Sequence, residues 1–200
     1  MNILQPPNAV FLTGLVVYFW IRHCFINRTK TEKRTVRRVD AIEKILLGMM
    51  LPAVLLLPLL YLFTPLISFA DYRLPLFFRW AGTAVMVASL WLFWRSHTDL
   101  GQNWSVSLEI RENHELVSSG VYRLVRHPMY ASIWLWGIAQ GMILNNWLAG
   151  WAVLPAFAAM YFIRTPREER LMVETFGEAY RQYAAQTGRV FPRFTKSAEP

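Results

Sequence analysis

Long apolar segments alternate with short polar ones along this chain. Five apolar segments stand out, at residues 9–26, 45–63, 76–94, 129–143 and 148–163. A helix crosses the ~30 Å hydrocarbon layer of a membrane with about 20 mostly apolar residues. The pattern therefore predicts an all-α integral membrane protein with about five transmembrane helices. The short gap at 144–147 predicts that the last two form a tight helical hairpin.

Two prolines, Pro52 and Pro58, interrupt the second apolar segment. Prolines are tolerated in membrane helices because neighbouring groups can bind the carbonyls that they free. The first part of the chain, 1–95, has few polar residues within its apolar segments and is predicted to anchor the protein in the membrane. Residues 96–200 place polar stretches around the hairpin, so we expect this half to be the catalytic one.

The polar stretch before the fourth apolar segment contains a strand-like pattern. The sequence WSVSLEI, at 104–110, alternates well enough for a short strand, and ENHE, at 112–115, is typical of a turn. Non-helical backbone is rare where it would face lipid. We therefore expect this stretch at the cytoplasmic surface or against a cavity that protein covers.

A further helix is predicted after the hairpin. Thr165, Pro166 and Glu168 fit the N-cap, N1 and N3 positions of a capping box. Apolar positions then recur at three- and four-residue spacing, at Met172, Phe176, Tyr180 and Tyr183. This spacing predicts an amphipathic helix that ends near Gly188 and either lies on the membrane or folds back over the hairpin.

Positive charges lie mostly on one side of the predicted helices. Lys and Arg number eight within 22–44, four within 95–126 and seven within 164–200, whereas only Arg73 and Arg79 fall on the opposite side. Lys and Arg that flank membrane spans are retained on the cytoplasmic side. We therefore expect the N-terminus outside and the C-terminus in the cytoplasm.

Composition agrees with a membrane protein. Hydrophobic residues make up 54% of the chain, and this topology explains the net charge of +8 better than a nucleic-acid site does. The basic run RTKTEKRTVRR, at 28–38, is predicted to be a loop beside anionic lipid. The single cysteine, Cys24, excludes an internal disulfide and a cysteine-based metal site. The apolar N-terminal segment lacks the features of a cleaved signal peptide and is expected to stay as an anchor.

The densest polar chemistry lies in GVYRLVRHPMY, at 120–130, at the entry to the fourth apolar segment. Pro128 suits the first turn of a helix, where outward-pointing N–H groups favour bound anions. Arg126 and His127 could there meet an anionic or polar ligand. The alternative is that His127 is only an interfacial residue that caps the helix.

Acidic and basic residues after the hairpin also have two interpretations. Glu168 is either the N3 residue of a capping box or part of a site, and Glu169 is interpreted first as a solvated residue. The two face different directions on a helix, which argues against a paired-carboxylate hydrolase. Arg164 either extends its charged end to the membrane surface or pairs with a substrate carboxylate.

Several catalytic signatures are missing from the sequence, among them a phosphate-binding glycine-rich loop, HExxH, GxSxG and a cysteine nucleophile. The remaining inventory suits a reaction without a metal or a covalent intermediate. Group transfer from an activated donor by in-line displacement is such a reaction, because positioning supplies most of its acceleration.

Two motifs together resemble a known family. GVYRLVRHPMY, followed at 168–192 by EERLMVETFGEAYRQYAAQTGRVFP, resembles the paired signature of the isoprenylcysteine carboxyl methyltransferase family, within a wider group that includes phospholipid N-methyltransferases. The stretches DLGQNWS and HELVSSG resemble the same family. The resemblance covers residues 99–192 and is specific, because the two motifs, their spacing around the hairpin and the topology agree.

This resemblance implies a multi-pass enzyme that binds S-adenosylmethionine in a cytoplasmic pocket closed by the C-terminal helix, without a metal. The cofactor contacts that it implies are His114, Glu115, Leu116, Val117, Tyr122, His127, Pro128, Met129, Tyr130 and Glu168. Arg164 matches the family's arginine near the substrate carboxylate. The implied acceptor is lipophilic and enters from the bilayer, foremost a C-terminal isoprenylcysteine that becomes a methyl ester.

Other functions stay open at this point. A carboxylate is already ionised at neutral pH and needs no base to attack a methyl group, and the cation Arg164 favours it. An amine acceptor of the phosphatidylethanolamine type would need a base to remove a proton. A sterol-type reductase that uses NADPH would need a basic pocket for the 2′-phosphate. A non-enzymatic membrane protein would use the motif only as an interfacial anchor.

Overall fold

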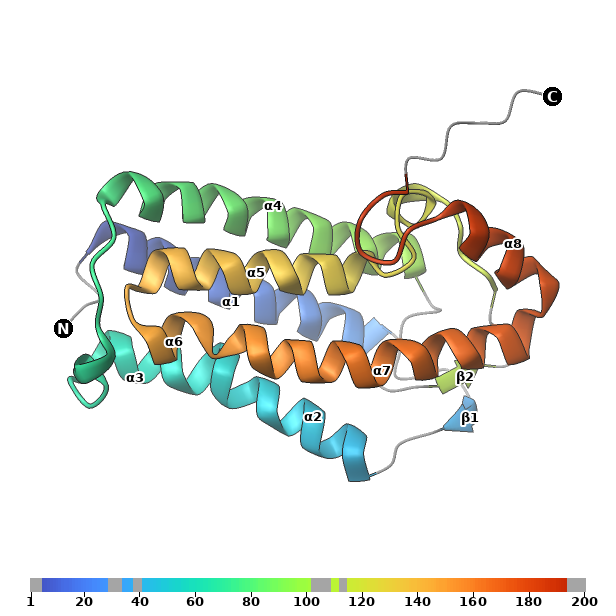
Figure 1. Ribbon diagram of the computed structural model, residues 1–200, viewed down its shortest axis with the longest axis horizontal. Helices are drawn as coiled ribbons and strands as arrows, with labels where there is room; N and C mark the ends of the chain where they lie inside the picture. The colour runs from blue at the N-terminus through green and yellow to red at the C-terminus, as the bar shows by residue number, and fades with distance from the viewer. Residues whose placement is uncertain (1–4, 29–33, 38–40, 102–108, 112–114, 194–200) are drawn as a thin grey trace.

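The computed structural model describes residues 5–28, 34–37, 41–101, 109–111 and 115–193. Its helices lie side by side along the long axis of the molecule (Figure 1). In chain order they are α1 (Pro6–Arg28), α2 (Ala41–Leu51), the π-helix η2 (Pro52–Leu56), α3 (Leu57–Phe63), the 3₁₀-helix η3 (Ser68–Ala70), α4 (Leu76–Leu100), the 3₁₀-helix η5 (Gly120–Arg123), α5 (Pro128–Leu144), α6 (Trp147–Trp151), α7 (Val153–Phe176) and α8 (Glu178–Gln186).

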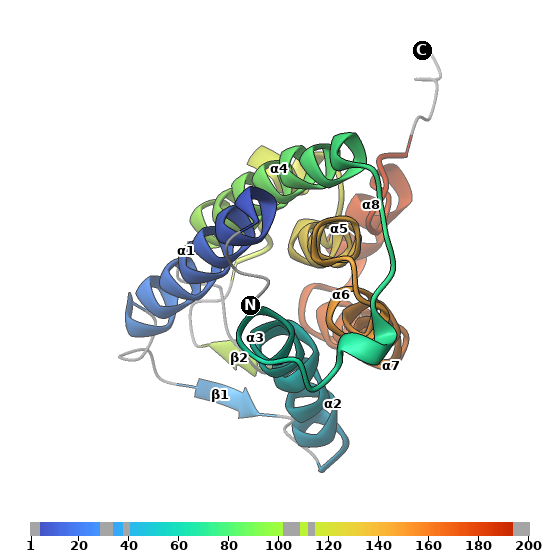
Figure 2. The ribbon, with the colours of Figure 1, turned by 90° about the vertical axis from the view of Figure 1, so that its left-hand side faces the viewer.

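The predicted architecture of apolar membrane helices is confirmed. Four helical segments are long and apolar enough to cross a membrane: Pro6–Asn27, Lys44–Phe63, Leu76–Leu100 and Trp147–Phe176. The fourth predicted segment forms α5, which has 17 residues. Figure 2 shows α5 in the middle of the bundle, and most of its residues are buried. Protein rather than lipid therefore surrounds this shorter helix.

Aromatic residues hold α1, α4 and α5 together. Tyr18 of α1 stacks on Phe93 of α4 with ring centroids 4.4 Å apart, and it contacts Trp136 of α5 at 5.1 Å. Close backbone approach complements these rings, because a side chain on Gly82 of α4 would collide with Met142 of α5. The helices on either side of residue 95 thus share one core, while the assignment of separate roles to 1–95 and 96–200 stays a prediction.

The predicted hairpin between the fourth and fifth apolar segments is also confirmed. Asn145 ends α5 with a left-handed backbone, φ 45° and ψ 34°. The Asn146 side chain then accepts hydrogen bonds from the amides of Leu148 and Ala149, at 3.1 and 2.9 Å, and so caps α6. Asparagine suits both positions, because its short amide side chain tolerates the left-handed region and binds free helix N–H groups.

A buried glutamine satisfies the backbone where the prolines interrupt the second membrane helix. In η2 the hydrogen bonds run from residue i+5 to residue i, and Pro58 has no N–H to offer the carbonyl of Ala53. Gln140 of α5 donates to that carbonyl at 2.9 Å and to the carbonyl of Ala149 at 2.7 Å. Its own carbonyl accepts from the indole of Trp136 at 2.9 Å.

Replacing Gln140 with leucine is expected to lower the free energy of unfolding by about 3 kcal/mol, because each buried polar group left without a partner costs roughly 1–3 kcal/mol. Denaturant unfolding in detergent micelles would measure the loss. Gln182→Leu, at an exposed position of α8, is the matched control. Equal stability of the two variants would contradict the role given to Gln140.

The helix start predicted at Thr165 is wrong. α7 runs unbroken from Val153 to Phe176 with Pro166 inside it, so Thr165 is no N-cap and Glu168 no capping-box residue. Arg164 and Thr165 are both buried, and α7 packs along α2. This burial compensates for the hydrogen bond that Pro166 cannot donate. The break comes instead at Gly177, whose φ of 56° separates α7 from α8.

A small antiparallel sheet lies at one end of the bundle. It pairs β1 (Arg34–Arg37) with β2 (Glu109–Arg111). β2 coincides with the end of the strand predicted at 104–110, whereas residues 102–108 and 112–114 of that stretch lie outside the described residues. The basic run at 28–38, predicted only as a loop, supplies β1. This sheet lies at the same end of the molecule as α8 (Figure 1).

Candidate functional site

The start of α5 is bound to the C-terminal part of the chain. Pro128 is the first residue of the helix and His127 its N-cap position. The amide of Arg126 donates to the carbonyl of Gly188, and the amide of His127 to the carbonyl of Arg189, both at 2.8 Å. We call residues 187–193 the C-terminal strap. Its backbone fixes the two residues that precede α5.

Glu169 lies at the centre of a group of cationic side chains. Its carboxylate accepts hydrogen bonds from Arg126 at 3.1 and 3.2 Å and lies 3.3 Å from Nε2 of His127. Arg189 of the strap binds both carboxylate oxygens, the closest contact being 2.7 Å. The Glu169 side chain is only 16% exposed. The interpretation of Glu169 as a solvated residue is therefore wrong, and it joins α7, the start of α5 and the strap.

Glu168 links three residues that the sequence assigned to the site. Its carboxylate accepts from the hydroxyl of Tyr130 at 2.7 Å and from Nε of Arg164 at 2.8 Å. Nδ1 of His127 lies 3.6 Å from its other oxygen. The rings of His127 and Tyr130 are stacked, 13° from parallel and 5.4 Å apart. Four of the predicted site residues thus form one connected group between α5 and α7.

Other predicted residues lie elsewhere. The hydroxyl of Tyr122 donates to the carbonyl of Ser96 in α4 at 3.2 Å, and Met129 packs against the core of α1, α4 and α5. Glu115, Leu116 and Val117 form an irregular segment before η5, in which Glu115 is exposed. His114 lies outside the described residues. The roles of residues 114–117 therefore stay predictions.

Tyrosines of η5 and α8 form a further contact between the segment before α5 and the C-terminal helix. Tyr183 donates to the carbonyl of Tyr122 at 2.6 Å. Burial raises the pKa of Tyr183 to about 12, although the nearby Arg126 charge opposes the shift. Burial also raises the pKa of Tyr122 and of Tyr180. All three hydroxyls are therefore protonated at neutral pH, and those of Tyr122 and Tyr183 act as hydrogen-bond donors rather than as bases.

A strong ion pair keeps the strap in place at its exposed side. Hydrogen bonds to Glu169 are the main reason that the pKa of Arg189 is raised above its ordinary value. Nη1 of Arg126 donates to the carbonyl of Ala184 at 2.8 Å and also to that of Thr187. Sequence reasoning missed these pairs, because their members come from segments far apart in the chain.

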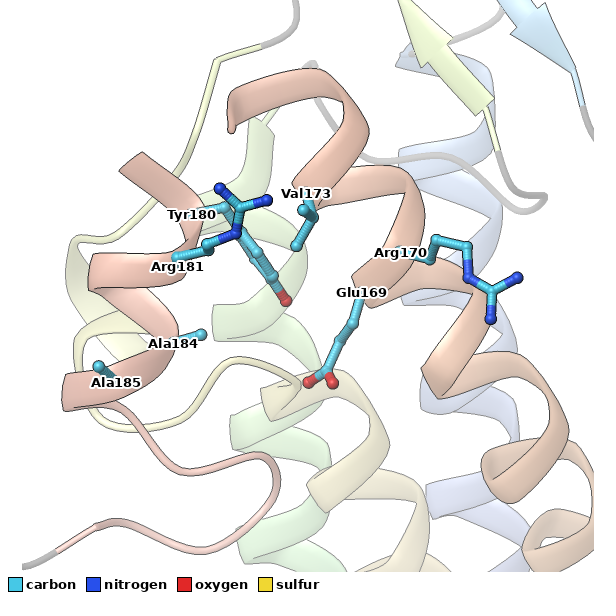
Figure 3. A pocket seen from close by; sticks show the side chains of 7 residues that line it. All are labelled: Glu169, Arg170, Val173, Tyr180, Arg181, Ala184 and Ala185. Atoms are coloured by element: carbon cyan, nitrogen blue, oxygen red, sulfur yellow. The ribbon is translucent and has the colours of Figure 1, made fainter. Parts of the chain in front are cut away.

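An open pocket of about 520 Å³ lies between α7 and α8. Its lining residues are Glu169, Arg170, Val173, Tyr180, Arg181, Ala184 and Ala185. In Figure 3 the Tyr180 hydroxyl is directed into the space between the helices, whereas Arg170 extends to the far side of α7. The pocket is within the size range of small-molecule sites. Its lining includes Glu169, Tyr180 and Ala184 of the contacts described above but not Glu168, so the pocket adjoins the Glu168 group without containing it.

The arrangement suits binding and positioning more than acid–base chemistry. Glu168 offers a carboxylate near two stacked rings, and Arg164 offers a guanidinium that Glu168 orients. Among the described residues, no group of three or more His, Cys, Asp or Glu side chains could hold a metal ion. Such a site can bind a cation beside Glu168 and an anion beside Arg164, at the end of the bundle where α5 begins.

Known proteins resemble this chain in the same region. Residues 80–174 match the family model described as isoprenylcysteine carboxyl methyltransferase (ICMT) family. Protein-S-isoprenylcysteine O-methyltransferase A of Arabidopsis thaliana is 30% identical over 111 residues, which cover 56% of this chain and 54% of that protein. The cobalt-zinc-cadmium resistance protein CzcN of Cupriavidus metallidurans is 36% identical over 121 residues, covering 58% and 55%.

The chain spans about half the length of the curated relatives that it matches. A solved structure of the eukaryotic intramembrane Ras methyltransferase ICMT superposes with a TM-score of 0.58 at 22% sequence identity, covering 96% of this chain and 69% of that one. At this identity the likeness concerns the fold. It extends the similarity from the matched segment to nearly the whole bundle.

Proposed function

We propose that this chain, whose residues 80–174 match the isoprenylcysteine carboxyl methyltransferase family model, is an integral membrane methyltransferase that esterifies the carboxylate of a lipophilic acceptor. The acceptor that the family suggests is a C-terminal isoprenylcysteine. The observation that carries the proposal is the Arg164–Glu168–Tyr130 chain of contacts, which puts a carboxylate-binding guanidinium beside the motif at the start of α5.

The residues at the start of α5 fit S-adenosylmethionine as the methyl donor. Its sulfonium and ammonium groups are cationic, and Glu168 offers a carboxylate. Its adenine ring is flat, and the stacked His127 and Tyr130 rings offer flat faces. The first amides of α5 suit its carboxylate, because helix N-termini favour anions. When bound, this cofactor supplies an electrophilic methyl group. Pro128, Met129, Tyr122 and residues 114–117 stay predicted contacts.

Arg164 is proposed to hold the acceptor carboxylate. The acceptor is ionised at neutral pH, so no residue has to remove a proton before attack. Glu168 fixes the guanidinium at 2.8 Å and thereby its direction. The buried surroundings of Arg164 exclude water that would otherwise solvate the carboxylate. The protein's contribution is therefore to orient the acceptor and to keep it dry.

In our proposal this site lies at the cytoplasmic membrane surface. The excess of Lys and Arg lies on the side of the C-terminus, which puts the N-terminus outside. The α2 and α7 helices expose apolar side chains such as Ile45 and Phe162 to lipid. A prenyl chain in the bilayer can then reach the bundle while its carboxylate stays near the polar end.

The experiment supplies purified protein in lipid nanodiscs with methyl-labelled S-adenosylmethionine and N-acetyl-S-farnesylcysteine. We expect transferred label that alkali releases as methanol, which identifies a carboxyl methyl ester. If the label is instead found on phosphatidylethanolamine, resists alkali and is transferred faster at higher pH, the acceptor is an amine and not a carboxylate. If the protein binds NADPH and does not bind S-adenosylmethionine, the proposed methyl transfer is wrong and the protein is a reductase.

A further inference from the structure

The C-terminal strap presents an apolar side chain outward. Phe191 is 81% exposed, and Leu124, in the segment beside the strap, is 59% exposed. The two segments run side by side, since Val125 and Gly188 pair as a parallel β-bridge. Both side chains therefore lie on the surface of the paired segments, and large exposed apolar side chains can mark a contact with another apolar phase.

The strap holds Phe191 in this position from both ends. A side chain on Gly188 would collide with the carbonyl of Phe191, so the chain makes a tight turn that only glycine permits. Beyond the turn, Arg193 donates to the carbonyl of Ala185 in α8 at 2.9 Å. Phe191 is therefore the tip of an anchored turn rather than part of a loose tail.

The turn lies at the level where the membrane helices end. The strap carbonyl of Arg189 accepts a hydrogen bond from the amide of His127, the residue directly before the apolar helix α5. Figure 1 shows the strap beside the C-terminal end of α4 and the start of α5. At that end of α4 the Trp94 side chain is 44% exposed. Aromatic residues collect at this depth because their rings suit the boundary between headgroups and acyl chains.

We propose that Phe191 and Leu124 insert into the interfacial region of the lipid bilayer, which makes the C-terminal strap a membrane-bound element that also carries contacts of the site. The occupant is lipid because the strap is bound to the two residues that precede the apolar helix α5, and the exposed Trp94 of α4 lies toward the same end of the bundle. The exposed arginines Arg123 and Arg193 flank the tip, where guanidinium groups can bind lipid phosphates. This inference goes beyond methyl transfer and does not depend on the acceptor.

The test places a polarity-sensitive fluorophore at Phe191→Cys in the full chain, with Cys24→Ala so that the label has one target. Nanodiscs contain phosphatidylcholine and a lipid that carries a quenching spin label near the headgroup end of its acyl chain. Glu178→Cys, at the exposed start of α8, is the aqueous reference, and Val87→Cys, exposed in the middle of α4, is the membrane reference.

We expect several-fold stronger quenching at residue 191 than at residue 178, with a blue-shifted emission. Quenching at 191 equal to that at 178 would overturn the proposal. A blue shift without lipid quenching would also overturn the proposal, because the fluorophore would then be covered by a second copy of the protein and not by lipid. Because Phe191 makes no core contact, the variant should melt at the parent temperature. The readout needs no methyl transfer, so it stands apart from the assay of the proposed function.

Discussion

Replacing Arg164 with lysine is expected to lower kcat/KM for methyl transfer by about 10²–10³-fold, as removal of one preorganised donor does in other active sites. The guanidinium binds Glu168 through Nε at 2.8 Å, which fixes the plane in which its other two nitrogens lie. A lysine ammonium is a compact point charge and cannot keep both contacts in one plane. The side chain is 8% exposed, so water does not replace the lost contact.

The measurement compares kcat and KM for N-acetyl-S-farnesylcysteine in wild type and variant, together with binding of S-adenosylmethionine. The loss should fall on the acceptor, while binding of the methyl donor changes little. Arg73→Lys, the same substitution at an exposed position near the opposite end of α4, is the control and should behave as wild type. An unchanged kcat/KM in Arg164→Lys would remove this residue from the acceptor site.

Hydropathy predicted the membrane helices well, because long apolar runs have few alternatives to a helix in lipid. The hairpin was predictable for a similar reason: Asn145 and Asn146 offer, within two residues, a left-handed end and a cap. The extent of α5 was also predicted, at 129–143 against the observed Pro128–Leu144, whereas its largely buried position beside α4, α6 and α7 was not.

The sequence misled where a local signal competed with burial. Thr165, Pro166 and Glu168 satisfy a capping box, yet α7 continues through them. A capping interaction contributes about 1 kcal/mol, whereas burying one large apolar side chain contributes roughly 1.5–3 kcal/mol. Packing of α7 along α2 therefore outweighs the cap. The η2 π-helix was equally hidden, because its stability comes from Gln140 on a distant helix.

The spacing of the motifs predicted part of the site but not the ion pairs of Glu169 that hold it together. His127, Tyr130, Arg164 and Glu168 are brought together by the structure. Glu169 was assigned to solvent because its partners, Arg126 and Arg189, lie 43 and 20 residues away along the chain. A single sequence gives no measure of which distant charges meet. The adjacent acidic pair and the arginine after Gly188 were the only signals available.

Replacing Glu169 with glutamine is expected to lower the free energy of unfolding by about 3 kcal/mol, the lower end of the range for breaking a buried ion pair. Glutamine keeps the shape of the side chain but leaves Arg126, which is 11% exposed, without a countercharge. Arg189 is 52% exposed, so water screens its part of the loss. Denaturant unfolding in micelles would measure the change.

The same variant should release the C-terminal strap before the bundle unfolds. The amides of Arg126 and His127 are bound to Gly188 and Arg189, so their hydrogen exchange reports on the strap. We expect faster exchange at both amides in Glu169→Gln and no change at the Arg126 amide in Glu168→Gln, whose described contacts are with His127, Tyr130 and Arg164.

Arg189→Gln is expected to reproduce the faster amide exchange with a smaller loss of stability, because it removes the exposed partner and leaves Arg126 paired. The double variant should then lose less than the sum of the two single losses, since both substitutions break the same contact. Strictly additive losses, or unchanged exchange at Arg126 and His127, would mean that the strap is held by its backbone and tyrosine contacts alone. Glu169 would in that case stabilise only the start of α5.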